Sequence, residues 1–268
     1  MRSALLSSFF LTAVTLTATL TFFGQEIKDT KEPGRMLAGE SLVYDGKISK
    51  LKFSVSIAEL VFAATAQPDS SNLVVKTQAA SKGTLIKLFR YSFLQQYEST
   101  VDLKEFRVAK TTKHDVQKQR VRDSEAVFDY AEKRVRYVET DPKDANRPPR
   151  RIASEISTPT YDLISAIYSM RLEPLTVGKK FDLSISDSGL VYKVPIVVTA
   201  REQQKTMFGK VWCYRVEPQI FGPGRLIEQK GKMVIWMVDD ARRTPVLAKI
   251  NTTYGEVEIK LKSVVSPT

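Results

Sequence analysis

The chain has 268 residues, of which 41 are lysine or arginine and 30 are aspartate or glutamate, with one cysteine and one histidine. A single cysteine cannot close a bridge within the chain, which excludes a small scaffold held by disulfides. The formal charge of +11 favours polyanionic partners, among them nucleic acid, anionic lipid and acidic envelope polymers.

The N-terminus carries the clearest targeting signal. An uncharged stretch of 20 residues, Ala4–Phe23, follows Arg2, as in a secretory signal peptide or an N-terminal membrane anchor. Cleavage after Gly24 would leave Phe22 where signal peptidase requires a small side chain, and 20 apolar residues also suffice for one membrane span. We expect an exported, periplasmic protein whose residues 1–24 are either a cleaved signal or a retained anchor that holds it near a membrane.

The rest of the chain is long enough for one domain with a large core. Residues 25–38 lack periodicity and are expected to form a tether, and residues 39–268 to form a single β-domain. Export disfavours nucleic acid as a partner, and no nucleic-acid recognition motif accompanies the basic residues.

A period of two residues, typical of half-buried strands, dominates from residue 39 onward. In the first run Leu51, Phe53, Val55 and Ile57 share one face, and further on Leu60 and Phe62 carry the apolar face, which predicts a bulge. Further strands are expected at 72–80, 105–110, 116–128, 133–140, 180–186, 190–200, 210–219, 232–238, 244–253 and 256–263. The segment 141–149 contains three prolines and is expected to be an exposed loop.

One segment has helical spacing instead. Apolar residues at positions 163, 164, 167 and 170 lie between Pro159 and Pro174, which predicts a helix over about 160–171 that covers one end of the sheet. Thr158 or Thr160 is the expected N-cap. The run Met233–Val238 is apolar on both faces, so it requires cover by a helix, a loop or a bound apolar molecule.

Residues suited to catalysis or metal binding are sparse. His114 has no neighbouring cysteine or carboxylate cluster in the sequence, and Cys213 lies on an expected strand, where it is best explained as a small buried apolar residue. Asp239 and Asp240 fall between two strands, where aspartates bond to turn backbone. We therefore expect no catalytic residue, no metal site, no cofactor and no enzymatic activity.

Positive charge is densest between Arg107 and Arg122. Within it Lys118, Arg120 and Arg122 alternate as one face of a strand would, and the alternative to a functional role is a solvated surface. With Arg242 and Arg243 they are candidates for binding an anionic head group.

Three blocks of sequence together resemble a known family. They are Gly39–Tyr44, Tyr161–Arg171 followed by Pro174 and Gly178, and the hairpin Trp-Met-Val-Asp-Asp-Ala-Arg-Arg-Thr-Pro-Val at 236–246. They resemble the bacterial envelope family catalogued as domain of unknown function 3108, over about residues 39–261. The family name implies no activity; by looser analogy, the chain is similar to exported antiparallel half-barrels that carry lipid or lipoprotein.

These observations predict a mainly β protein: an antiparallel curved sheet or half-barrel of about ten to twelve strands with one helix. The preferred function is non-enzymatic binding of a hydrophobic or lipid-like ligand on the concave side. The alternative is a structural or assembly protein of the envelope that contacts other envelope proteins. The candidate lining residues, for which a filled core is the favoured alternative, are Phe53, Val55, Ile57, Ile164, Ile167, Met233, Ile235 and Met237.

Overall fold

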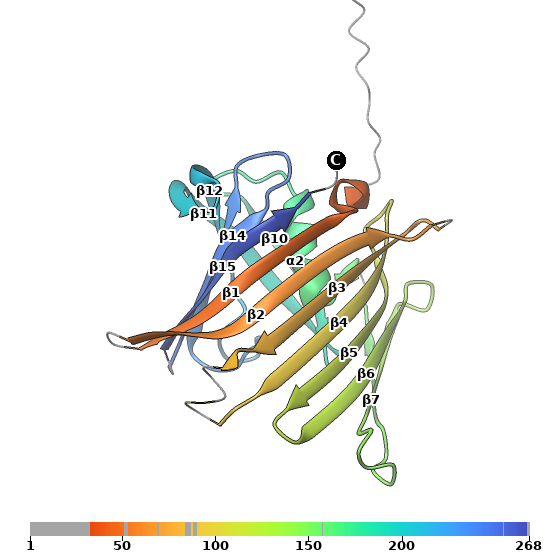
Figure 1. Cartoon of the computed structure of the whole chain (residues 1–268). Coiled ribbons are helices and arrows are strands. Elements are labelled where there is room, and N and C mark those ends of the chain that lie inside the picture. Colours follow the sequence, from red (N-terminus) through yellow and green to blue (C-terminus); the bar gives the residue numbers. More distant parts are fainter. Residues whose placement is uncertain are drawn as a thin grey trace, which may run out of the picture. The chain divides into compact units, whose positions relative to one another are not determined.

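A computed structural model describes residues 33–266 except 51–52, 69, 84–86, 88–89, 157 and 254. These residues form one sheet of fifteen strands, together with the 3-10 helix η1 (Pro33–Leu37) and the α-helix α2 (Leu163–Leu172) (Figure 1). The strands are β1 (Glu40–Lys50), β2 (Phe53–Ala66), β3 (Asn72–Ser81), β4 (Phe93–Asp102), β5 (Val108–Gln117), β6 (Arg120–Asp129), β7 (Arg134–Thr140), β8 (Arg150–Glu155), β9 (Thr160–Tyr161), β10 (Lys180–Asp187), β11 (Leu190–Thr206), β12 (Gly209–Pro218), β13 (Gly231–Val238), β14 (Pro245–Thr252) and β15 (Gly255–Val265).

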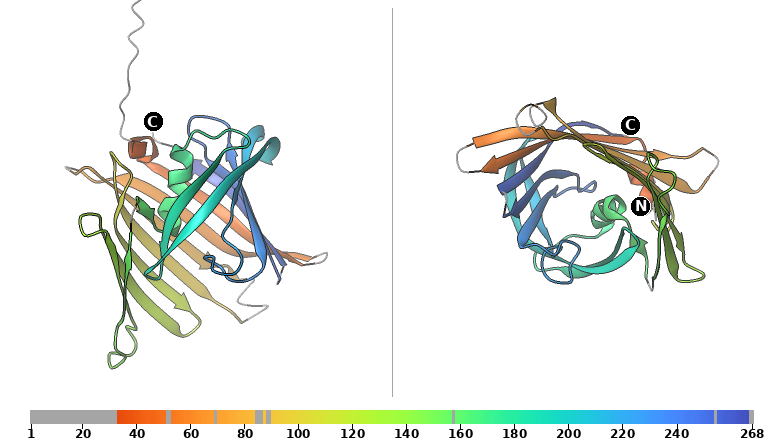
Figure 2. Two further views of the ribbon diagram at one scale, coloured as in Figure 1. Left: turned by 180° about the vertical axis from the view of Figure 1, so that it is seen from behind. Right: turned by 90° about the horizontal axis from the view of Figure 1, so that it is seen from below.

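The sheet is an antiparallel meander whose two unpaired edges, β8 and β9, are consecutive strands in the middle of the chain. Its order runs β8-β7-β6-β5-β4-β3-β2-β1-β15-β14-β13-β12-β11-β10-β9, so β1 pairs with β15 while β8 and β9 are the two edges. All neighbours are antiparallel except β9 and β10. Seen from below, the sheet curls around α2 (Figure 2). The predicted mainly β, antiparallel half-barrel with one helix is confirmed.

The sheet has more strands than the ten to twelve expected. Val116–Phe128 was predicted as one strand, but Lys118 has a φ of +55° and turns the chain between β5 and β6. Lys133, with a φ of +51°, lies in the next turn. Left-handed backbone usually falls on glycine or asparagine, so turns built from lysine gave no signal in the sequence. Lys118 is therefore not on a strand face with Arg120 and Arg122.

The edge strand β8 contacts the other half of the sheet at one point. Ser154 of β8 donates a hydrogen bond of 2.7 Å from its Oγ to the carbonyl oxygen of Gly189, in the turn between β10 and β11. Gly189 has a φ of +83°, and a Cβ atom there would lie 2.7 Å from Cβ of Tyr137 and 2.8 Å from Cβ of Ile152. Only glycine allows this close approach without a shift of backbone.

Helix α2 lies inside the curl of the sheet and is fixed to it at its first turn. Asp162 is the N-cap: its Oδ1 accepts bonds of 2.8 Å from the backbone N–H groups of Ile164 and Ser165. Its Oδ2 accepts a 2.7 Å bond from Thr111 Oγ1 of β5. The expected cap at Thr158 or Thr160 was wrong, because Thr160 belongs to β9 and its hydroxyl contacts Ser184.

Replacing Asp162 with alanine should lower the free energy of unfolding by about 1–3 kcal/mol, since the helix loses its cap and the bond to β5. Thr111→Val removes only the second bond. In a double-mutant cycle followed by urea unfolding, the two changes should be coupled by about 0.5–1.5 kcal/mol. Thr112→Val, next along β5 and directed away from α2, is the matched control; equal effects of the two threonine variants would contradict this assignment.

The C-terminal end of α2 is held by a buried ion pair. Arg171 and Glu40 are each 1% exposed, and the guanidinium binds the carboxylate through two bonds of 2.6 and 2.7 Å. The Nε of Arg171 also donates to the carbonyl oxygen of Arg242, and Arg243 Nη1 donates to the carbonyl oxygen of Arg171. This network joins α2 to the start of β1 and to the turn between β13 and β14.

The N-terminal boundary of the domain lies earlier than expected. Residues 33–37 form η1, and Leu37 is fully buried in the core, so this part of the expected tether packs on the sheet. The signal or anchor at residues 1–24 and the start of the tether lie outside the described residues. Among the residues that are described, no helix is long and apolar enough to cross a bilayer.

Candidate ligand-binding cavity between the helix and the sheet

Helix α2 does not fill the space inside the sheet. Two adjacent cavities, of about 190 and 330 Å³, remain between its apolar face and the strands. They share four lining residues, Ile164 and Ile167 from α2 and Met233 and Ile235 from β13. The alternation of β13 places Met233 and Ile235 on the same face, directed at the helix.

The smaller cavity lies beside β1, β2 and β14. Its apolar lining includes Leu42, Leu60, Phe62, Ala248 and Ile259. Tyr44 and Tyr168 contribute ring surface; the Tyr44 hydroxyl is turned away to donate 2.9 Å to the carbonyl oxygen of Pro245. Burial raises the pKa of both phenols, so both remain protonated and uncharged.

The larger cavity is lined by β10, β11 and the connection between β12 and β13. Leu183, Ile185 and Ile196 form its wall. Ile220, Leu226 and Ile227, all in the segment between β12 and β13, close another side. That segment is folded back on itself, with Ile227 donating to the carbonyl oxygen of Ile220 and Gly222 donating to that of Ile227, each at 2.9 Å.

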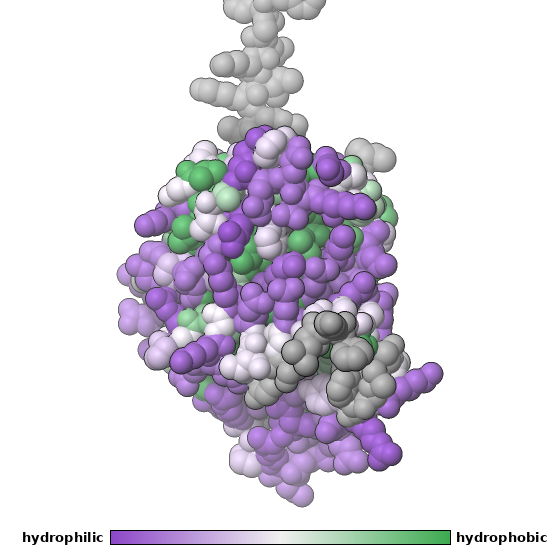
Figure 3. All heavy atoms as spheres, turned by 90° about the vertical axis from the view of Figure 1, so that its left-hand side faces the viewer, coloured by the Kyte–Doolittle hydropathy of each residue, from purple (hydrophilic) through white to green (hydrophobic). Residues whose placement is uncertain are grey.

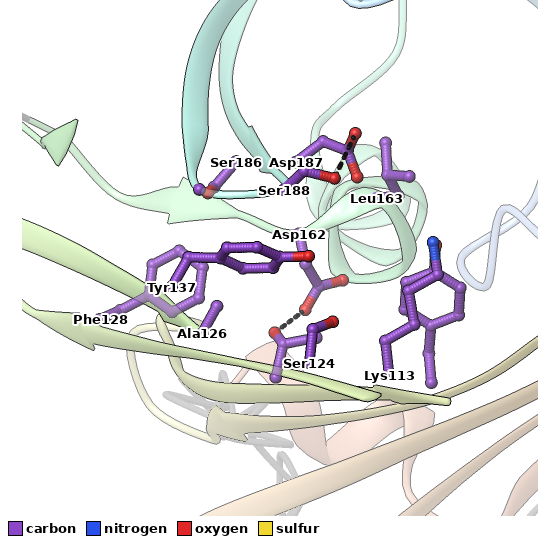
Figure 4. A pocket seen from close by; sticks show the side chains of 13 residues that line it. Lys113, Ser124, Ala126, Phe128, Tyr137, Asp162, Leu163, Ser186, Asp187 and Ser188 are labelled. Atoms are coloured by element: carbon purple, nitrogen blue, oxygen red, sulfur yellow. Dashed lines mark hydrogen bonds between the residues drawn. The ribbon is translucent and has the colours of Figure 1, made fainter. Parts of the chain in front are cut away.

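A small polar pocket of about 30 Å³ lies at the other side of the helix start, between β4–β7 and the turn at Gly189 (Figure 4). Lys113, Ser124, Asp162 and Asp187 are among its lining residues. Leu163 and Asp187 border both this pocket and the larger apolar cavity. The concave side therefore offers an apolar space with a polar group at its margin.

Lys113 and Tyr97 of the polar pocket keep their protons near neutral pH. Burial acts to lower the pKa of Lys113, but Tyr97 and the carboxylates of Asp115 and Asp187 outweigh it and hold that pKa above its usual value. Burial raises the pKa of Tyr97, whose ring lies 4.9 Å from the Lys113 ammonium. Lys113 thus stays a cation and Tyr97 a neutral phenol near neutral pH, so neither is poised as a general base.

The structure brings together half of the predicted lining residues. Ile164, Ile167, Met233 and Ile235 line both cavities, whereas Met237 is fully buried in the filled core beside them. Val55 and Ile57 lie on β2 beyond a register shift opposite Gly46 and do not line either cavity. The side chain of Phe53 lies outside what the structure describes. The ligand-binding role of all these residues stays a prediction.

Sequence reasoning missed several cavity residues. Leu42, Leu60 and Phe62 carry a signal that was available, because β1 and β2 alternate and the apolar face after the phase change was recognised. Leu183 and Ile196 had no distinguishing signal. Their strands look like any other core strand, and whether an apolar side chain borders a void depends on the packing opposite.

The predicted head-group residues do not form one site. Lys118, Arg120 and Arg122 lie at the turn between β5 and β6, where Arg120 pairs with Asp115 at 2.5 Å and Arg122 pairs with Asp141. Arg242 and Arg243 lie in the turn between β13 and β14, at the opposite end of the sheet (Figure 1). Their role as anion-binding residues stays a prediction.

The residues considered for chemistry have structural partners. Asp240 Oδ1 accepts from the backbone N–H groups of Arg242 and Arg243, at 3.0 and 2.7 Å, which confirms its predicted place in a turn. Cys213 is fully buried, as predicted, and burial raises its pKa to about 11. His114 Nδ1 lies 2.5 Å from Asp123 Oδ1. Within the described part of the chain, no three histidine, cysteine or acidic residues gather to hold a metal ion.

A family model described as protein of unknown function DUF3108 matches residues 44–262, from β1 to β15. The chain belongs to the DUF3108 family. This confirms the resemblance seen in the sequence blocks around Tyr161–Arg171 and 236–246. No curated protein matches the chain.

Two solved structures are similar to this DUF3108 protein. One is a β-barrel-like protein of domain of unknown function DUF1849 from Brucella abortus, 8% identical, with a TM-score of 0.58 over 86% of this chain and 98% of that chain. The other, from Bacteroides fragilis, is described as a candidate exported protein with a YmcC-like fold; it is 10% identical, with a TM-score of 0.37 over 85% of this chain and 96% of that one. The first likeness shows a shared fold and nothing about activity.

Proposed function

We propose that this DUF3108 protein is an exported, non-enzymatic binding protein of the envelope that holds an acyl chain or similar apolar molecule between α2 and the sheet. The observation that carries the proposal is the larger cavity of about 330 Å³, within the range of small-molecule sites. Among its described lining residues only Asp187 is polar. Apolar surface of this kind is poorly solvated by water, and a ligand that covers it gains about 25 cal/mol per Å².

The arrangement of polar groups supports an amphipathic ligand. The polar pocket of Lys113, Ser124 and Asp187 adjoins the larger cavity at the start of α2. A ligand whose apolar tail lay against Ile220 and Ile227 would have its polar end at these groups. Since Lys113 keeps its proton and Tyr97 is neutral, binding without turnover fits the site better than acid–base chemistry.

The alternative role in envelope assembly has weaker support. Strand addition needs an exposed edge, and β8 is one edge of the sheet. However, β8 carries Arg150, Arg151 and Glu155 as exposed side chains. Charged residues of this kind discourage pairing with another strand.

The proposal predicts that lipid co-purifies with the protein. The full chain would be purified, extracted with organic solvent and its extract examined by mass spectrometry. The delipidated protein would then be titrated with N-phenyl-1-naphthylamine, whose fluorescence rises in apolar sites. We expect saturable binding and its displacement by palmitate. Absence of lipid in repeated extracts together with no saturable dye signal would refute the proposal.

Filling the cavity should weaken binding. Ile167 borders both cavities, so Ile167→Trp is expected to occupy the shared space and weaken dye binding by about tenfold or more. Val127→Trp places the same side chain at an exposed position on β6 and should leave binding unchanged. Equal affinities of the two variants, both folded by circular dichroism, would show that the dye binds elsewhere.

A further inference from the structure

The hairpin of β11 and β12 ends in two exposed apolar residues. Met207 and Phe208 form the two-residue turn, and their side chains are 44% and 46% exposed. Two-residue hairpin turns are commonly built from asparagine, aspartate and glycine. Large apolar side chains in this position expose surface to water that polar turn residues would not.

The turn is held in one conformation. Thr206 Oγ1 accepts a 3.0 Å bond from the backbone N–H of Phe208 and donates a 3.1 Å bond to the carbonyl oxygen of Gly209. Gly209 has a φ of +86°, which an L-residue rarely adopts. Met207 and Phe208 are therefore presented by a preorganised tip, and little backbone entropy is lost when the tip contacts a partner.

The charge of the tip is uniformly positive. Residues 204–211 contain Lys205 and Lys210 and no acidic residue. The two lysines are direct cross-strand partners, both exposed, and neither forms an ion pair with another described residue. Like charges placed opposite each other destabilise a hairpin, and a negatively charged surface would relieve this repulsion.

The hairpin carries an exposed aromatic ring near its tip. Trp212 is 46% exposed, and the Arg201 guanidinium lies 4.5 Å from its ring centre. Arg201 Nε also donates 2.6 Å to Asp239 Oδ2, and the Asp239 backbone N–H donates 2.9 Å to the carbonyl oxygen of Trp212. Tryptophan and arginine in this combination are typical of membrane–water interfaces.

We propose that the tip of the β11–β12 hairpin docks on an anionic lipid surface, with Met207 and Phe208 in the interfacial region and Lys205 and Lys210 on the head groups. The hairpin tip lies at the same end of the sheet as η1, where the described chain begins (Figure 1). The face drawn in the space-filling view is mainly hydrophilic, and its apolar patches are separate from one another (Figure 3). The proposed surface is independent of the cavity and of any ligand in it.

A fluorescent reporter at the tip tests this proposal in the full chain. Met207→Cys would be labelled with bimane, and the buried Cys213 is expected not to react. Labelled protein would be mixed with vesicles of phosphatidylcholine alone or with one quarter phosphatidylglycerol, each containing brominated phosphatidylcholine as quencher. Leu190→Cys, 44% exposed at the other end of β11, is the reporter control. The readout does not depend on how the N-terminal segment interacts with the vesicles.

We expect quenching of the Met207 reporter in anionic vesicles, and none of the Leu190 reporter. Phe208→Ser should abolish this quenching. Each of Lys205→Gln and Lys210→Gln should raise the lipid concentration for half-maximal quenching by about fivefold. Lys143→Gln removes the same single charge from an exposed position at the opposite end of the sheet and should change nothing.

Any of four results would overturn the proposal. No quenching at position 207 would show that the tip stays in water or meets a protein instead. Equal quenching of both reporters, or equal quenching in neutral vesicles, would show that contact is not specific to the tip or to anionic lipid. A change in bimane emission that depends on protein concentration without vesicles would identify a second copy of the chain as the partner.

Discussion

Replacing Arg171 with leucine is expected to lower the free energy of unfolding by about 3–5 kcal/mol, the usual cost of breaking a buried ion pair from one side. The variant leaves the Glu40 carboxylate 1% exposed and without its cation. It also removes the bond from Arg171 Nε to the carbonyl oxygen of Arg242. Urea unfolding measures the change, provided that the unfolding free energy of both proteins depends on urea concentration with the same slope.

The double variant Glu40→Met/Arg171→Leu separates two explanations of that loss. A buried pair can be replaced by apolar residues at small cost, because the desolvation of both charges disappears with them. We therefore expect the double variant to be more stable than Arg171→Leu alone. If the two single effects simply add, the ion pair is not the source of the loss, and the remaining bonds of Arg171 are.

Gly189→Ala should have the second largest effect on stability and lower the free energy of unfolding by about 2–5 kcal/mol. One part of this loss comes from the left-handed backbone at a φ of +83°, and the other part comes from the clash of the new Cβ with Tyr137 and Ile152. Because this contact joins β7 and β8 to the turn between β10 and β11, hydrogen exchange of β7 and β8 should rise together with that of β10.

Gly178→Ala isolates the backbone contribution. Gly178 has a φ of +91°, but a Cβ there meets no atom within 4 Å. We expect the free energy of unfolding to fall by about 1–2 kcal/mol and hydrogen exchange at β8 to stay unchanged. Equal losses of stability for the two glycines would show that the contact of Gly189 with β7 and β8 does not constrain the sheet.

The class of fold was predictable because it depends on alternation, which the sequence displays directly. Local alternation alone predicts strands, as at Val257, Ile259 and Leu261 or at Leu60 and Phe62. The turns at Lys118 and Lys133 were not predictable in the same way. Their left-handed conformation is imposed by the strands that they connect and not by the residue itself.

The site was predictable only in part, since it depends on contacts between distant residues. Helical spacing identified Ile164 and Ile167, and the two-sided apolar run identified Met233 and Ile235. Met237 packs in filled core while Ile235 borders a void, and this difference depends on the side chains that face each residue from other parts of the chain. The pairing of Glu40 with Arg171, 131 residues apart, likewise has no local sign in the sequence.

The position of the opening in the sheet bears on how the chain folds. Since β1 pairs with β15 while the edges β8 and β9 are consecutive in sequence, every other pairing in the sheet joins strands that are adjacent in the chain. The strands up to β8 can form a meander as soon as they emerge, but β1 keeps one side unpaired until β15 follows it. Closure of that side is a contact of very high sequence separation, and such contacts form slowly. Of the strands that end up paired on both sides, β1 therefore has an exposed edge for longest during folding, which makes it the one on which a chaperone is most needed and aggregation most easily begins.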